Sequence, residues 1–172
     1  MTYCEATRGS ITDQYTVAEK AAYAPDLVCG EVIEVRDVSG LKKYVFMQAD
    51  DAITAGQFVK LDMAAIGTAA ALKATPTAAV ADVLLGLPAG AAAVADESYF
   101  WCQIFGRASG GTVKTGVAIG DPLTCSATAG ALIKQTNTTT APEMVGAVAL
   151  EANGSGSDAV KAVFLLGIGF AG

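Results

Sequence analysis

Three pairs of glycines recur in this chain at nearly equal spacing, and this recurrence constrains the fold more than any other feature. The pairs lie 64, 60 and 61 residues apart and are Gly56–Gly120, Gly86–Gly146 and Gly106–Gly167. Gly56 and Gly120 each come before a short apolar stretch, and Gly106 and Gly167 each end one. Because a glycine within a strand lets a barrel bend or another backbone approach, the spacing predicts one β unit repeated twice. Two such units would close into a small barrel or sandwich without long bare edges.

Short runs of alternating or apolar residues separated by turn residues favour strands throughout residues 31–167. The expected strands are residues 31–37, 43–48, 57–62, 83–88, 98–106, 122–126, 131–135, 144–152 and 159–166. The aromatic run at residues 98–106 gives the strongest strand signal and holds the only tryptophan, Trp101. Residues 63–79 are rich in alanine and threonine, and their Gly67 and Pro76 favour a strand plus a loop over a long helix. The chain is therefore expected to be all-β, a small β-barrel or sandwich.

The first 30 residues lack a clean period and are expected to form an extended N-terminal arm. Threonines and tyrosines favour extended backbone there, and residues 17–23 have the composition of a short helix before Pro25. The arm is expected to order on a partner, with an ordinary first strand of the domain as the alternative. The predicted organisation is an arm at 1–30 and a β domain at 31–172. The first five residues carry no basic, signal-like region.

The chain contains no histidine, which removes the commonest general base and the commonest metal ligand. Its four cysteines, Cys4, Cys29, Cys102 and Cys125, show no CxxC spacing, so no metal site is expected. Buried free thiols are favoured, and two disulfides in any of three pairings remain the alternative. No catalytic, cofactor-binding or metal-ligating residues are assigned.

Carboxylate catalysis stays formally open, but the acidic residues are scattered and mostly lie beside turn residues. The pair Asp50-Asp51 is interpreted as a solvated turn. Residues 86–90 are glycine-rich without forming a phosphate-binding pattern. The sequence therefore predicts a protein that is not an enzyme and needs no cofactor.

The net charge of −6 and the absence of any lysine or arginine cluster argue against a nucleic-acid partner. Charged residues make up only 16% of the chain and hydrophobic residues 52%. No stretch long enough to span a membrane is free of polar residues, so a membrane partner is not expected. A low-charge surface rich in small apolar residues indicates that other protein surfaces cover much of it.

Several segments, taken in order, resemble head decoration proteins, the cement proteins of tailed bacteriophage capsids. They are residues 53–59 (ITAGQFV), 85–89 (LGLPA), 99–106 (YFWCQIFG), 120–124 (GDPLT), 128–132 (TAGAL) and 144–152 (MVGAVALEA). The resemblance covers about residues 31–167, and the segments at 1–30 and near residue 70 depart from it.

This resemblance implies a β-barrel-like virion protein on the outside of an assembled capsid, made in the host cytoplasm. Such proteins bridge neighbouring major capsid proteins, commonly as homotrimers and sometimes as dimers or monomers, and many copies on a lattice raise the avidity. In this interpretation residues 1–28 are an arm that adds a strand to a neighbouring sheet.

Other functions remain open at this point. The chain could be another phage structural subunit, such as a head-fibre base, or a carbohydrate-binding β module. The sugar-binding alternative requires Tyr99 and Trp101 to expose their rings, whereas their strand is expected to be buried.

Overall fold

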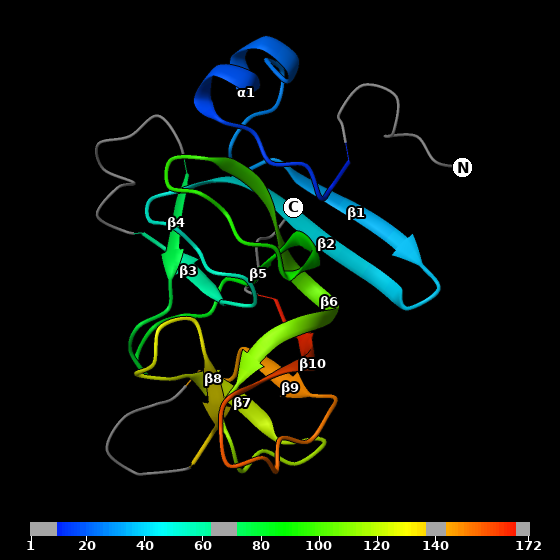
Figure 1. The fold of residues 1–172 in the computed structure, drawn as a ribbon. Helices are drawn as coiled ribbons and strands as arrows, with labels where there is room; N and C mark the ends of the chain where they lie inside the picture. The colour runs from blue at the N-terminus through cyan, green and yellow to red at the C-terminus, as the bar shows by residue number, and fades with distance from the viewer. Residues whose placement is uncertain (1–9, 63–71, 137–143, 168–172) are drawn as a thin grey trace.

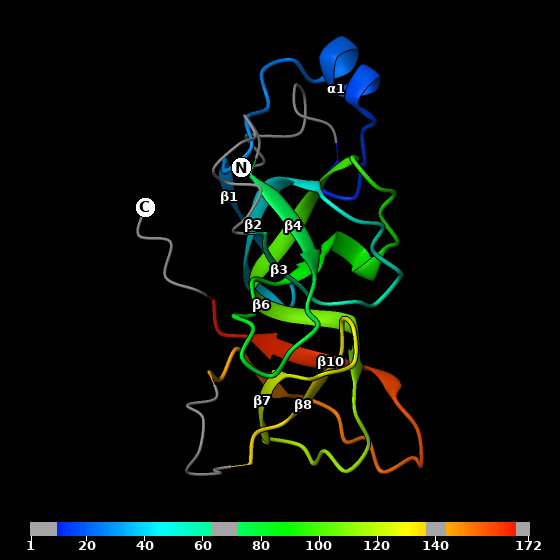
Figure 2. The same ribbon diagram turned by 90° about the vertical axis from the view of Figure 1, so that its left-hand side faces the viewer.

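The computed structural model describes residues 10–62, 72–136 and 144–167, and it is almost entirely β. One short helix, α1 (Val17–Tyr23), and the 3-10 turn η1 (Ala89–Ala91) are the helical elements of this described part. The strands form two stacked groups that share β6 (Tyr99–Val113), as Figure 2 shows from the side. The predicted all-β, barrel-containing class is confirmed.

The first group is a five-strand ring made of β2 (Gly40–Ala49), β3 (Val59–Leu61), β4 (Lys73–Pro76), β5 (Leu87–Pro88) and the first half of β6. β2 pairs parallel with β4 and antiparallel with β6, while β3 pairs with β4 and β5 with β6. An isolated bridge between Val59 and Gly86 closes the ring.

The second group repeats the same connectivity. It contains the second half of β6, β7 (Pro122–Cys125), β8 (Leu132–Lys134), β9 (Ala147–Ala149) and β10 (Ala159–Leu165). β6 pairs parallel with β8 and antiparallel with β10, β7 pairs with β8 and β9, and β9 pairs with β10. This second ring is a closed five-strand barrel in the described residues.

The internal repeat is therefore confirmed, with β2–β6 of the first barrel matching β6–β10 of the second. The entry turns match in detail, because Gly56 and Gly120 have φ values of 80° and 85°. The side chains after them, Gln57 and Asp121, each accept a hydrogen bond from the backbone N–H three residues earlier at 2.8 Å.

The predicted correspondence between Gly86 and Gly146 is wrong. Val59 pairs with Gly86, whereas its counterpart Leu123 pairs with Ala147, so Gly86 corresponds to Ala147 and not to Gly146. Gly86 has to be glycine because a Cβ there would lie 2.0 Å from the Gln103 carbonyl oxygen. A Cβ at Gly146 would instead meet the Leu84 side chain, so a different contact explains why that position is glycine.

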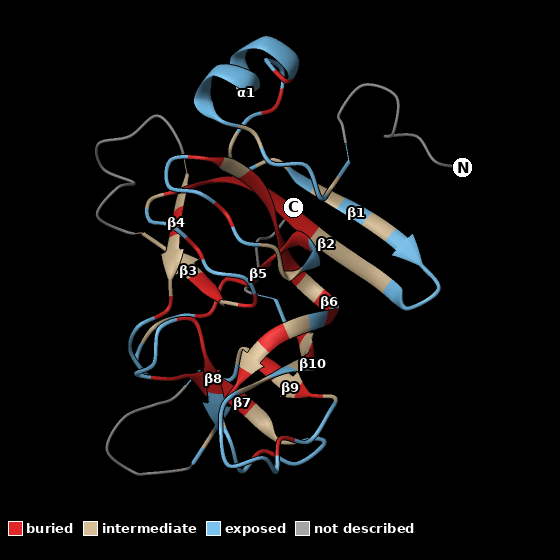
Figure 3. Ribbon diagram, viewed as in Figure 1, coloured by how far each residue is buried: buried red, intermediate tan, exposed pale blue. Residues whose placement is uncertain are grey.

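Strand alternation separates the interior of the first barrel from an outer aromatic layer. Much of β2 and of the first half of β6 is buried (Figure 3). Val45, Met47 and Phe100 point into the barrel core, while Phe46 and Trp101 point outward into a second cluster. Both sets are buried, which is why the run in β2 reads as continuously apolar. Trp101, 2% exposed, is thus a packing residue, as expected.

Residues 10–30 cover this aromatic layer. Their backbone forms a two-way bridge with β6, in which Tyr15 and Tyr99 exchange N–H···O bonds of 2.9 and 2.7 Å. Leu27, 3% exposed, packs with Phe46 and Trp101. The described part of the predicted extended arm is therefore a helix-containing cover, since the aromatic face otherwise lies open to water. Residues 1–9 lie outside the described residues, and the division into an arm and a domain stays a prediction.

Helix α1 begins with a capping box, in which Thr16 and Glu19 each bond the other's backbone N–H. None of its seven residues is buried. The strand-plus-loop prediction for residues 63–79 is confirmed at β4, while residues 63–71 lie outside the described part.

Phe58 joins the two barrels. It belongs to the first repeat by sequence, but its ring packs in the core of the second barrel with Leu123 and Val163. The junction is also bonded through the backbone, from Phe58 N–H to Gly130 O, Gly130 N–H to Thr77 O and Thr77 N–H to Phe58 O at 2.7–3.0 Å. The two barrels consequently form one continuous body.

Candidate interaction surfaces

The acidic pair Asp50-Asp51 lies at one end of the first barrel and is tied to neighbours. Lys73 Nζ bonds Asp50 Oδ1 at 2.8 Å and Glu97 Oε1 at 2.7 Å. Asp51 accepts a hydrogen bond from the Thr75 hydroxyl at 3.0 Å. The hydrogen bond from Lys73 is the main cause that lowers the pKa of Asp50. Asp50 and Glu97 therefore converge on the Lys73 ammonium, and this arrangement holds the loops of the barrel together.

Removing the ammonium at position 73 is expected to weaken the pH dependence of stability. The lowered folded-state pKa of Asp50 gives stability that is present above its ordinary pKa and is lost as pH falls through the lowered value. Lys73→Met should therefore show a smaller drop in its urea midpoint between about pH 7 and about pH 3 than the wild type. Lys161→Met, which removes a lysine that no described residue pairs with, should keep the wild-type profile. Equal profiles for all three proteins would contradict the assignment.

The cysteines in the described residues are unpaired. Cys102 and Cys125 are buried and Cys29 is half-buried. Burial raises the pKa of all three thiols, that of Cys125 to about 11. The prediction of buried free thiols is confirmed for Cys102 and Cys125, and Cys29 is also free; Cys4 lies outside the described residues.

These thiols are expected to be nearly inert in the folded protein, because the reactive thiolate is suppressed and covered. Native protein treated with an aromatic disulfide reagent should leave Cys102 and Cys125 unmodified and modify Cys29 slowly. Peptide mapping by mass spectrometry identifies the labelled positions, with protein unfolded in urea as the fully reactive control. Labelling of Cys102 at the rate of an open thiol would overturn this expectation.

The aromatic residues of the sugar-binding alternative do not form an exposed platform. Trp101 packs against Phe46 with ring centroids 5.1 Å apart, and Phe46 stacks on Tyr99 at 5.8 Å. Because Trp101 is 2% exposed, its face offers no stacking surface to a glycan.

A different set of side chains, the waist row, lines the outer wall where the two barrels meet. It consists of Phe105, Arg107, Phe164, Val148 and Pro122. Residues paired directly across antiparallel strands project to the same side of the sheet. Register pairs Phe164 with Arg107 and with Val148, and pairs Val148 with Pro122. The Phe105 and Phe164 rings meet edge to face at 5.5 Å, which places Phe105 in the same row.

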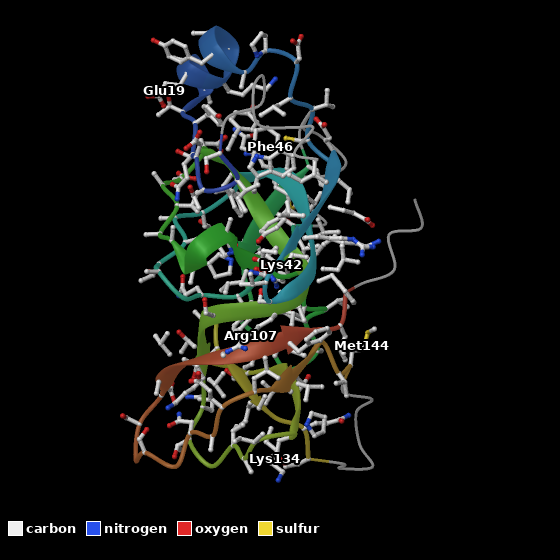
Figure 4. All side chains as sticks on the ribbon, turned by 90° about the vertical axis from the view of Figure 1, so that its right-hand side faces the viewer. Glu19, Lys42, Phe46, Arg107, Lys134 and Met144 are labelled. Atoms are coloured by element: carbon white, nitrogen blue, oxygen red, sulfur yellow. The ribbon has the colours of Figure 1, made fainter. Side chains whose placement is uncertain are left out.

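The waist row is open to solvent and extends into further apolar side chains. Arg107 is exposed, and its four companions are half-buried. Beyond the row, Met144, Val145 and Leu166 are 58%, 37% and 42% exposed, and Leu166 N–H bonds Gly146 O at 3.1 Å. Figure 4 shows Arg107 and Met144 at the same height of the molecule. No described residue forms an ion pair with Arg107.

Sequence reasoning missed the waist row. Phe105 is part of the strand predicted at residues 98–106, but Arg107 lies beyond the predicted end of that strand, after Gly106, whose φ is 92°. Because side chains alternate along a strand, Phe105 and Arg107 both face outward across the buried Gly106. A glycine between two outward-facing large residues was the available signal.

The described residues bring together no group of three or more Cys, Asp or Glu side chains suited to a metal ion. Among them, none of the helices is long and apolar enough to cross a membrane.

Comparison with known proteins finds little. No protein-family model matches the chain, and no curated protein matches it. Among solved structures, a crystal structure of the N base of head fiber gp8.5 of bacteriophage phi29 is similar over 78% of this chain and 94% of that one, with a TM-score of 0.44 and 11% sequence identity.

Proposed function

We propose that this chain is a structural virion protein that binds the outside of an assembled phage capsid and stabilises contacts between major capsid proteins. The family resemblance of residues 31–167 suggests this role, and the waist row is the surface that carries it. The proposal includes no enzymatic activity, no cofactor and assembly as a homo-oligomer.

The waist row has the composition of a protein-binding surface. Interface cores are enriched in aromatic residues, methionine and arginine. Here two phenylalanines lie beside an arginine with which no described residue forms an ion pair, and Met144 and Leu166 are also exposed. The strands beneath belong to a closed barrel, so these side chains are held in place before binding and lose little freedom on it.

One contact through a surface as small as the waist row gives modest affinity. Repetition of that contact over a capsid lattice makes the binding strong. When several copies are linked, each later binding event becomes intramolecular and the avidity rises without new contacts. Copies that engage two capsid subunits at once would hold those subunits together. This is the physical basis of the stabilisation that we propose.

The test uses phage heads that lack this protein, prepared from a strain with its gene deleted. Purified full-length chain is added, bound protein is measured by co-sedimentation, and the decorated heads are reconstructed by electron cryo-microscopy. We expect saturable binding at fixed lattice positions and a higher temperature of DNA release from the decorated heads. Density at the tail or on a fibre, or absence of the chain from virions, would overturn the capsid assignment.

Arg107→Glu tests whether the waist row is the binding surface. The reversal should weaken head binding about tenfold or more, since each 1.4 kcal/mol corresponds to a factor of ten. Lys161→Glu makes the same change in net charge on a neighbouring strand and should bind as the wild type. Equal binding of the two variants would place the contact elsewhere on the molecule.

A further inference from the structure

The outer edge of β1 (Val32–Asp37) is open to pairing. β1 pairs antiparallel with β2 in a hairpin that projects from the first barrel (Figure 1), and no other described strand pairs with it. An open edge presents unbonded N–H and C=O groups that pair readily with another strand.

The turn of the hairpin shows which backbone groups face outward. Asp37 and Gly40 flank a two-residue loop, and Phe46 N–H bonds Glu31 O at 2.9 Å. Bonded pairs alternate in an antiparallel ladder. The odd residues of β1 therefore bond β2, and Val32, Glu34 and Arg36 direct their N–H and C=O groups to the open edge.

Reversing the order of the side chains on the outer face of the hairpin exchanges the positions of its two opposite charges. They are Val32, Glu34, Arg36 and Val38, an apolar residue at each end and opposite charges between. All four are exposed, Val32 at 42% and Val38 at 109%. Glu34 bonds Lys43 at 2.7 Å, while no described residue forms an ion pair with Arg36. The sequence is complementary to itself when the strand is reversed.

We propose that β1 pairs antiparallel with β1 of a second copy of this chain, across a two-fold axis at Val35. In this register Glu34 lies opposite the partner's Arg36, a pair that occurs twice by symmetry. Val32 lies at the level of the partner's Val38, the first residue of the turn that follows β1. The bonded positions are the even residues, which are the ones whose backbone groups face outward. The inward side chains pair Val35 with Val35 and Ile33 with Asp37.

The charges select this register over its neighbours. A shift of two residues keeps the backbone bonding but places Glu34 opposite Glu34 in one direction, or Arg36 opposite Arg36 in the other. Like charges directly opposite each other destabilise a strand pair, whereas opposite charges stabilise it. The carboxylate of Glu34 would then lie between Lys43 and the partner's Arg36, an arginine with which no described residue of its own chain forms an ion pair.

This two-fold contact is independent of capsid binding and differs from the trimer that the family resemblance implies. Sedimentation velocity over a range of concentrations, with native mass spectrometry, should show a monomer–dimer equilibrium. A chain that remains monomeric at the highest concentration would overturn the proposal, and so would a trimer without a dimer.

Charge reversal tests the register. Arg36→Glu places two acid pairs across the axis and should weaken dimerisation about tenfold or more. Glu34→Arg should do the same with two basic pairs. The double variant Glu34→Arg/Arg36→Glu restores opposite charges and should regain at least most of the lost affinity. Lys161→Glu controls for net charge and should dimerise as the wild type.

Hydrogen exchange supplies a second readout that needs no substitution. The amides of Val32, Glu34 and Arg36 should become protected as protein concentration rises. The protection of the amides around Val160 in β10 should not change with concentration. Dimerisation without concentration-dependent protection at these three amides would place the contact elsewhere and refute the pairing.

Discussion

Replacing Gly86 with alanine is expected to destabilise the protein strongly. The new Cβ would lie 2.0 Å from the carbonyl oxygen of Gln103 and 2.9 Å from its carbon. Both atoms belong to the backbone of β6, which is bonded on both sides and cannot move aside. Overpacking costs about 1–3 kcal/mol where side chains can adjust, so we expect at least about 3 kcal/mol here.

The measurement is thermal unfolding followed by circular dichroism. A loss of about 3 kcal/mol corresponds to a fall in Tm of about 6–12 °C for a chain of this size. Gly156→Ala is the matched control, because a Cβ there meets nothing within 4 Å and Gly156 has no positive φ. Similar melting of the two variants would show that β5 does not close the first barrel as described.

Phe58→Ala is expected to cost about 3–5 kcal/mol, the usual range for removing a buried aromatic side chain. Phe58 is fully buried and lies in the core of the second barrel, although it directly precedes β3 of the first barrel. Its loss would leave a cavity at the junction of the two units. Urea unfolding measures the resulting change in the free energy of unfolding.

A second substitution makes this prediction specific. A Cβ at Gly111 would lie 2.1 Å from Phe58 Cζ, and the three nearest atoms all belong to that ring. Gly111→Ala alone should destabilise by about 1–3 kcal/mol, but it should cost nothing further in the Phe58→Ala background. Costs that simply add would mean that the ring does not occupy the space above Gly111.

The repeated architecture could be predicted from the sequence because glycines at bends are dictated by backbone approach. Gly56 and Gly120 occupy equivalent turns, and the predicted strands of both units are found. The matching failed at Gly86, where a strand-to-strand contact requires glycine in one unit and allows Ala147 in the other. Local sequence does not report how closely a distant strand approaches.

Two other features were beyond sequence reasoning for the same reason. The second half of β6 was not predicted, because Ser109, Gly110 and Gly111 have poor strand propensity. They lie in a strand because β10 pairs with this half of β6, while Ala91 and Phe58 leave no room for a Cβ at Gly110 and Gly111. The segment at residues 10–30 was expected to be extended, and its role as a cover was not predicted. That role depends on the aromatic face of β2 and β6, which lies far along the chain.

The double use of β6 has a consequence for how such molecules can grow. Each barrel needs five strands, yet the sequence repeats after four, because the last strand of one ring is the first of the next. β10 occupies in the second ring the place that β6 holds in the first. Insertion of one more four-strand period after β10 would therefore build a third ring with no connecting linker, and lengthening by whole periods is the modular route open to this architecture.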